Sequence, residues 1–209
     1  LQLLAGFLET LKVFVLTLVF SIPLGLLVCF GSMSRFSPLR ILTRGFVWVI
    51  RGTPLMLQLI IIFYGPGLMF DLPSLPRMTA TVLAFSINYA CYFSEIFRGG
   101  IMSVDNGQFE AGRSLGFTYG QTMIYIILPQ AVKNALPAMC NEFIALLKES
   151  SIVGYIGLMD LTKAGDIIRS NTYEAMIPLC SVAVVYLIIV MILTAGVSRL
   201  ERRLKKDAR

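Results

Sequence analysis

The chain has 209 residues, of which 56% are hydrophobic and only 14% are charged, and its formal net charge is +6. A soluble domain of this size has about a quarter charged residues, so the composition argues against a soluble protein. The absence of histidine removes the commonest metal ligand and the usual proton carrier at neutral pH. The cysteines stand alone within apolar segments, without the paired spacing of metal ligands, and we interpret them as small buried residues.

Long runs without any Asp, Glu, Lys or Arg predict transmembrane helices, because about 20 apolar residues cross the hydrocarbon core of a bilayer. In chain order, we expect helices over 8–31, 46–70, 78–98, 123–147 and 175–198. The sequence therefore predicts an all-α integral membrane protein with about five transmembrane helices in a single domain, 1–209. The first hydrophobic segment is long enough to stay in the bilayer, so no signal peptide is needed, and the start at Leu1 suggests that a few residues precede it.

Basic residues in short loops decide the orientation, because they favour the cytoplasmic side. Arg35, Arg40 and Arg44 lie between the first two predicted helices, and the tail 199–209 is strongly basic. With five helices, both regions fall on the same side of the membrane. We therefore expect a cytoplasmic C-terminus and an N-terminus on the outside.

Two segments remain on the outer side. In 71–77, Pro73 and Pro76 exclude a helix. In 157–172, apolar residues recur at the spacing of a helical face, which predicts a short helix lying at the membrane interface.

On the inner side, the uncharged run 114–132 contains Gly116, Gly120 and Pro129, which a continuous helix would tolerate poorly. We therefore divide it, so that a short helix ends near residue 115 and the next helix begins a few residues later. Asp105 and Gln108 have the spacing of a capping box, and Gly116 fits a C-terminal cap. These signals predict a compact cytoplasmic helix of about ten residues.

The same inner segment carries a recognisable motif. Residues 103–117 read SVDNGQFEAGRSLGF, residues 51–54 read RGTP, and residues 95–100 read EIFRGG. The first motif resembles the EAA loop of ABC-importer permeases, and all three resemble the polar amino acid branch of that family. The resemblance covers essentially the whole chain in the same order.

In that family the EAA loop forms a coupling helix, which docks in a cleft on the cytoplasmic ATPase. The resemblance implies this role for the loop at about 103–120, through these residues: Glu110, Ala111, Gly112, Arg113, Ser114 and Gly116. Gly112 stands where the family commonly has a second alanine, and glycine weakens a helix by about 1 kcal/mol relative to alanine. We therefore expect docking to help to hold this helix. The alternative is an ordinary cytoplasmic connector.

The source of energy follows from a missing motif. No Gly-x-x-x-x-Gly-Lys-Ser/Thr loop occurs in the sequence, so the chain lacks the usual cradle for nucleotide phosphates. The resemblance implies a permease subunit, not itself an enzyme, of an ATP-driven importer of polar or basic amino acids in the bacterial inner membrane. The alternative is an ion-coupled secondary transporter of small polar solutes.

The resemblance also implies partners. We expect two ABC ATPase subunits that carry ATP and Mg, a second membrane subunit in a homodimer or heterodimer, and an extracytoplasmic substrate-binding protein. No nucleic acid is expected, because basic residues beside a membrane helix are explained by topology and anionic lipid.

Polar residues inside the predicted helices are candidates for the substrate pathway, because burying them in a membrane is costly. We expect these residues to line it: Asn88, Tyr92, Glu142 and Glu149. For Glu149, a local ion pair with Lys148 is the alternative. We interpret Glu95 as a structural partner of Arg98, one turn away, and Arg51 as an anchor at the membrane interface.

Overall fold

The computed structural model describes residues 2–206, and the side chains of 2–199, and the elements in this part of the chain are helical. The all-α fold class is therefore confirmed. The helices follow in this order: α1 Gln2–Ser32, α2 Ser37–Gly52, α3 Leu55–Phe70, α4 Arg77–Met102, α5 Gly107–Ser114, α6 Tyr119–Thr122, a π-helical turn Met123–Ile127, α7 Leu128–Glu149, a 3-10 segment Ser150–Ile156, α8 Leu161–Thr172 and α9 Met176–Lys206.

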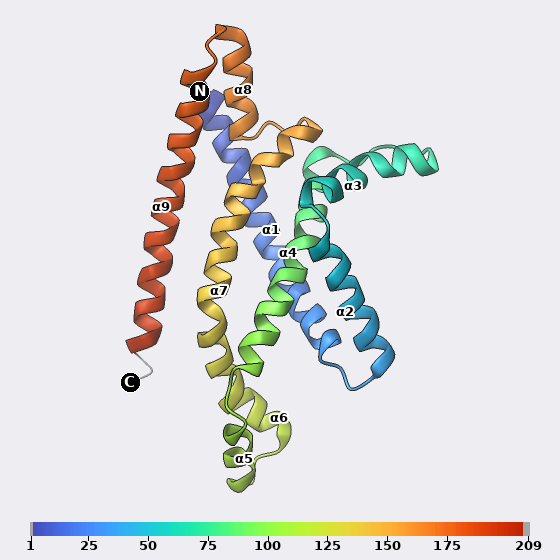
Figure 1. The fold of residues 1–209 in the computed structure, drawn as a ribbon, viewed down its shortest axis with the longest axis vertical. Helices are drawn as coiled ribbons and strands as arrows, with labels where there is room; N and C mark the ends of the chain where they lie inside the picture. The colour runs from blue at the N-terminus through green and yellow to red at the C-terminus, as the bar shows by residue number, and fades with distance from the viewer. Residues whose placement is uncertain (1, 207–209) are drawn as a thin grey trace.

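The long helices set the shape of the molecule (Figure 1). α1, α4, α7 and α9 run roughly along its long axis, while α5 and α6 project beyond them at one end. The C-terminal end of α9 lies toward that same end, and α8 and the N-terminus lie at the other. The predicted tail 199–209 begins inside α9, and 207–209 lie outside the described residues.

α1 and α4 pack against each other at the centre of the molecule. The buried face of α1 consists mostly of small residues at helical spacing: Gly6, Thr10, Val13, Thr17, Ser21, Gly25, Cys29 and Ser32. A Cβ atom on Gly25 would lie 2.9 Å from the Cβ atom of Phe93 and 3.1 Å from the Ala90 carbonyl oxygen. Small residues therefore allow a close approach of the two backbones. The opposite face of α1 carries large apolar side chains that are exposed, such as Val19.

Three described helical stretches are long and apolar enough to cross a membrane: Gln2–Ser32, Tyr119–Ile156 and Met176–Arg199. The pair α2 and α3 would be a fourth if the two helices are counted as one broken span. Helices are present in all five predicted segments, and three or four of them pass as spans by length and composition alone. α4 has the length of a span, but much of its surface is small or polar because other helices cover it.

The predicted continuous helix 46–70 is wrong, because α2 and α3 meet at an angle of 102°. Thr53 and Pro54 between them have extended backbone. Gln58 bridges the corner: its Nε2 atom donates to the Ile50 carbonyl at 2.8 Å and to the Thr53 hydroxyl at 2.7 Å. Its Oε1 atom accepts a hydrogen bond from the Asn88 side chain at 3.0 Å. One amide therefore fixes the corner and ties it to α4.

The predictions for the short segments between the long helices agree with the structure. Residues 71–76 are not helical, as the prolines indicate, and the short helix predicted within 157–172 is present as α8. Asp160 caps α8 by accepting from the Thr162 and Lys163 backbone amides, each at 3.0 Å. The division of 114–132 is confirmed, because α5 ends at Ser114 and α6 begins at Tyr119.

Candidate functional site

The loop predicted to couple to an ATPase folds as a helix with a defined end. Gly116 has a positive φ of 78°, its amide donates to the Arg113 carbonyl at 2.9 Å, and the Phe117 amide donates to the Gly112 carbonyl at 3.0 Å. These paired bonds form a Schellman C-cap, as the sequence predicts. α5 is therefore a closed structural unit of eight residues.

The start of α5 differs from the prediction. The side chain of Asp105 accepts from the Gly107 amide at 2.6 Å, and no capping box with Gln108 forms. The capping box lies instead at the head of α6, where Thr118 and Gln121 bond reciprocally. The sequence contains a signal for this second capping box, because Thr118 is followed three residues later by Gln121, which is the spacing of the motif.

α5 is fastened to α6 at Gly112. This residue is buried, and a Cβ atom on it would lie 2.6 Å from both Cγ2 and Oγ1 of Thr122. The rings of Phe109 and Tyr119 stack beside it with centroids 5.8 Å apart. The interpretation of Gly112 as a weak point held by docking is therefore incomplete, because the glycine permits close packing within this chain.

The same unit is joined to the long helices. A small apolar cluster of Val104, Ile127 and Ala131 lies beneath α5. Asn134 of α7 donates to the Ser103 hydroxyl at 2.9 Å, at the end of α4. A displacement of α5 would therefore be passed to both α4 and α7.

The outer surface of α5 is free within the described structure. Glu110, Ala111, Arg113 and Ser114 are exposed, and Leu115 is 71% exposed. α5 and α6 project from the body of the molecule (Figure 1). A rigid projecting helix with charged and apolar groups can act as a contact surface for a partner and transmit rigid-body motion.

The predicted pathway residues do not all lie in open positions. Asn88 is only 3% exposed and bonds to Gln58 at the α2–α3 corner. Glu149 is exposed and accepts a hydrogen bond from the Tyr89 hydroxyl at 2.8 Å, with no ion pair to Lys148 among the described residues. Tyr89, which comes from a helix 60 residues earlier, was missed by sequence reasoning because nothing local marks the pair.

Glu142 and Tyr92 are the other two predicted pathway residues. Glu142 is half-buried and within electrostatic range of Glu149 and Arg51. The guanidinium of Arg51 lies over the ring of Tyr92, 4.9 Å from its centroid. This cation–π contact turns the charge of Arg51 toward α4, a contact that the interpretation of Arg51 as a membrane-interface anchor did not include.

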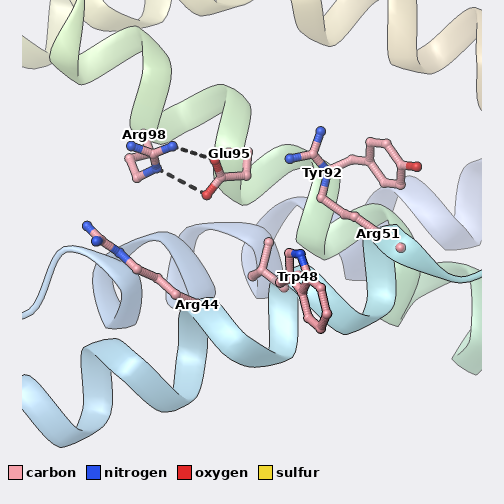
Figure 2. Close-up of a pocket in the computed structure, with 8 residues that line it drawn as sticks. Arg44, Trp48, Arg51, Tyr92, Glu95 and Arg98 are labelled. Atoms are coloured by element: carbon pink, nitrogen blue, oxygen red, sulfur yellow. Dashed lines mark hydrogen bonds and ion pairs between the residues drawn. The ribbon is translucent and has the colours of Figure 1, made fainter.

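Beside this region lies a cavity of about 500 Å³ between α2 and α4 (Figure 2). It is lined by Arg44, Val47, Trp48, Arg51, Gly52, Tyr92, Glu95 and Arg98. Arg98 donates to Glu95 through Nη2 at 2.5 Å and Nε at 3.1 Å. The structural ion pair predicted for Glu95 is thereby confirmed.

The other end of the molecule carries charges on α8. Asp166 pairs with Arg169 at 2.7 Å and with Lys163 at 3.5 Å. The hydrogen bond from Arg169 lowers the pKa of Asp166. At Asp160, burial raises the pKa of the carboxyl, although its backbone hydrogen bonds act in the opposite direction. The α8 surface therefore stays charged at neutral pH on its exposed side.

Together, the membrane helices and the projecting α5 define a helical transport permease. Residues 21–206 match the family of binding-protein-dependent transport system inner membrane components, and the chain belongs to this family. It is 38% identical over 205 residues to the arginine transport system permease protein ArtQ of Bacillus subtilis (strain 168), with 98% of this chain and 93% of ArtQ covered. It is also 38% identical over 205 residues to the probable glutamine ABC transporter permease protein GlnM of the same strain, with coverage of 97% and 93%.

A solved structure agrees with these relatives. The crystal structure of an amino acid ABC transporter with histidines matches this fold with a TM-score of 0.92 and 42% sequence identity. The match covers 97% of this chain and 94% of the other. The EAA-loop resemblance and the type I importer fold are therefore confirmed.

Proposed function

We propose that this chain is the transmembrane subunit of an ATP-driven importer of polar amino acids. The observation that carries the proposal is the capped helix α5, which is locked to α6 through Gly112 and presents an exposed charged surface. Relatives named for arginine and glutamine transport support the substrate class. The complex also contains two ATPase subunits that bind ATP and Mg, a second membrane subunit and an extracytoplasmic binding protein.

In this proposal α5 is the coupling helix, and its end of the molecule faces the cytoplasm. The basic residues Arg35, Arg40 and Arg44 favour that orientation. The binding protein then docks at the opposite end, around 71–77 and 157–174, a surface that includes α8. Closure of the ATPase subunits pushes α5, and the contact between Ser103 and Asn134 passes the movement to α4 and α7.

The substrate moves along the polar side of α4 and α7. Glu142 and Glu149 lie two helical turns apart, about 10 Å, on α7. Either carboxylate can pair with the ammonium group of an amino acid or with a guanidinium. The ring of Tyr92 lies 6.1 Å from that of Tyr89, which donates to Glu149. Asn88 contributes by holding the α2–α3 corner. ATP hydrolysis then returns the pathway to its inward-facing state.

The test is ATPase activity of the complex in lipid, assembled with the ATPase and the binding protein encoded beside this chain. Free amino acids, including L-arginine and L-glutamine, are screened as ligands. In Glu110→Lys we expect ligand-stimulated hydrolysis to fall about tenfold or more, because a like-charge contact at an interface costs several kcal/mol. Glu110→Gln, which removes the charge without reversing it, is the matched variant and should lose less activity.

Two results would contradict the proposal. One is full coupling in Glu110→Lys with the complex intact, which would remove α5 from the coupling surface. The other is uptake into vesicles that continues without ATP and without any co-purifying ATPase, which would favour a secondary transporter.

A further inference from the structure

The cavity between α2 and α4 has an unbalanced charge. Its lining includes the three arginines Arg44, Arg51 and Arg98 but only one carboxylate, that of Glu95. Arg98 and Glu95 form a two-point ion pair and so neutralise each other. Two positive charges therefore remain on the α2 side of the cavity.

Neither remaining arginine has a carboxylate partner among the described residues. Arg44 donates from Nε to the Ser32 carbonyl at 3.2 Å, and this contact leaves its terminal amino groups free of any hydrogen bond in the described structure. Arg51 rests on the ring of Tyr92, which occupies a face of the guanidinium and leaves the N–H donors at its edge. Both arginines are exposed in the described structure, so a ligand that enters the cavity can reach their guanidinium groups.

The two arginines are placed to act together. They lie two turns apart on α2, so their side chains share one face of that helix. Figure 2 shows this face turned toward Tyr92 and Glu95 of α4. A guanidinium edge binds a carboxylate through two parallel hydrogen bonds, which a single ammonium cannot do.

We propose that this cavity binds the α-carboxylate of the transported amino acid, with Arg51 as the principal ligand and Arg44 as the second. The proposal rests on the function proposed above and adds the group of the substrate that is recognised. Every free α-amino acid carries this carboxylate whatever its side chain. A volume of about 500 Å³ is in the range of small-molecule sites.

The neighbouring charges support this assignment over a lipid headgroup. Arg51 and Glu142 attract each other electrostatically, and in this proposal the amino acid places its carboxylate at Arg51 and its ammonium group toward Glu142. Tyr92 belongs both to the cavity and to the polar region beside it. The cavity lining is mostly charged or polar, with Val47 and Trp48 as its apolar side chains.

Direct binding to the assembled permease–ATPase complex, without the binding protein, tests the proposal. Omitting the binding protein matters because that protein would select for the carboxylate by itself. Tritiated L-arginine and L-glutamine are the probes, and L-argininamide and L-glutaminamide, which lack the carboxylate charge, are the competitors. The complex is placed in phosphatidylcholine nanodiscs, with a second set that contains phosphatidylglycerol.

In the wild type we expect each amino acid that binds to compete at least about tenfold better than its amide. In Arg51→Gln we expect the Kd of the amino acid to rise about 10- to 100-fold, with the amide unaffected, since a charge-assisted bidentate contact is lost. Arg51→Lys should recover part of the loss, because it keeps the charge without the bidentate geometry. Arg40→Gln, on the same helix but outside the cavity lining, should leave both ligands unchanged.

Several results would overturn the assignment. They are equal binding of amino acid and amide to the wild type, no detectable binding at millimolar concentration in a complex that transports, and an unchanged Kd in Arg51→Gln. Displacement of the amino acid by phosphatidylglycerol would make the cavity a lipid site instead. If Arg51→Gln does not assemble, the comparison of amino acid and amide on the wild type decides alone.

The proposed function is checked separately in the same preparation. Ligand-stimulated ATPase activity of the wild type with its binding protein must be present before the cavity is judged. Its absence would refute the importer, whereas its presence together with equal binding of acid and amide would refute only the carboxylate site.

Discussion

Replacing Gly112 by alanine tests how α5 is held. The family commonly has alanine here, so the change looks favourable from sequence alone. In this chain the added Cβ atom would lie 2.6 Å from Cγ2 and from Oγ1 of Thr122, closer than the 3.0 Å below which real Cβ contacts are essentially never found. Thr122 is 1% exposed and its hydroxyl donates to the Thr118 carbonyl at 3.1 Å, so its side chain has little room to move.

The magnitude follows from two opposing effects. Overpacking a buried contact costs about 1–3 kcal/mol. The better helix propensity of alanine returns about 1 kcal/mol. Because the contact is so short, we place the cost in the upper half of its range. The net loss of stability in Gly112→Ala is then about 1–2 kcal/mol, with α5 displaced from α6.

The assay combines unfolding of the purified complex with ligand-stimulated ATPase activity. Gly120→Ala is the matched control, because a Cβ atom at Gly120 meets nothing within 4 Å and α6 should keep or gain stability. Thr122→Ala removes both atoms in the clash, so it should rescue Gly112→Ala with a coupling energy of about 1 kcal/mol or more in a double-mutant cycle. The reasoning fails if Gly112→Ala is as stable and as well coupled as Gly120→Ala.

Two further predictions concern α4. Asn88→Ala should lower the stability of the complex by about 1–3 kcal/mol, because the amide oxygen of Gln58 loses its hydrogen-bond donor at the α2–α3 corner; thermal unfolding measures this, and an unchanged midpoint would contradict it. Gly100→Ala should cost a similar amount, since its Cβ atom would lie 2.7 Å from the Ala131 carbonyl oxygen of α7. For that variant the control is Gly99→Ala, whose Cβ atom meets nothing within 4 Å, and equal stability of the two variants would refute the argument.

Much of the fold could be predicted from the sequence, because α1, α8 and α9 follow from hydropathy and helical spacing. The corner between α2 and α3 could not be found in that way, since a hydropathy window averages over a bend. A local signal was present in Thr53 and Pro54, because proline disfavours helix in the residue before it. What turns that signal into a fixed angle is the amide of Gln58, whose contact with α4 is not local.

In the candidate site, too, the features that depend on neighbouring residues could be predicted and the contacts between helices could not. The EAA-like motif placed α5 and its glycine cap, since both depend on neighbouring residues. The partner of Glu149 could not be predicted, because Tyr89 comes from another helix. The contact between Arg51 and Tyr92 could not be predicted for the same reason, because the ring comes from another helix.

The buried face of α1 has a consequence for how this protein tolerates sequence change. In a soluble protein, apolar residues occupy the interior, and substitutions on the surface usually change stability little. Here the outside of α1 is the greasy side, and its interior side accepts only small groups where Gly25 meets Phe93 and where Gly6 lies against the Asp160 backbone. Leucine is favourable on a lipid-facing surface, but it should be poorly tolerated on this interior face because it is too large. On the buried face of α1, a more hydrophobic and larger substitution should therefore be tolerated less well than a small one.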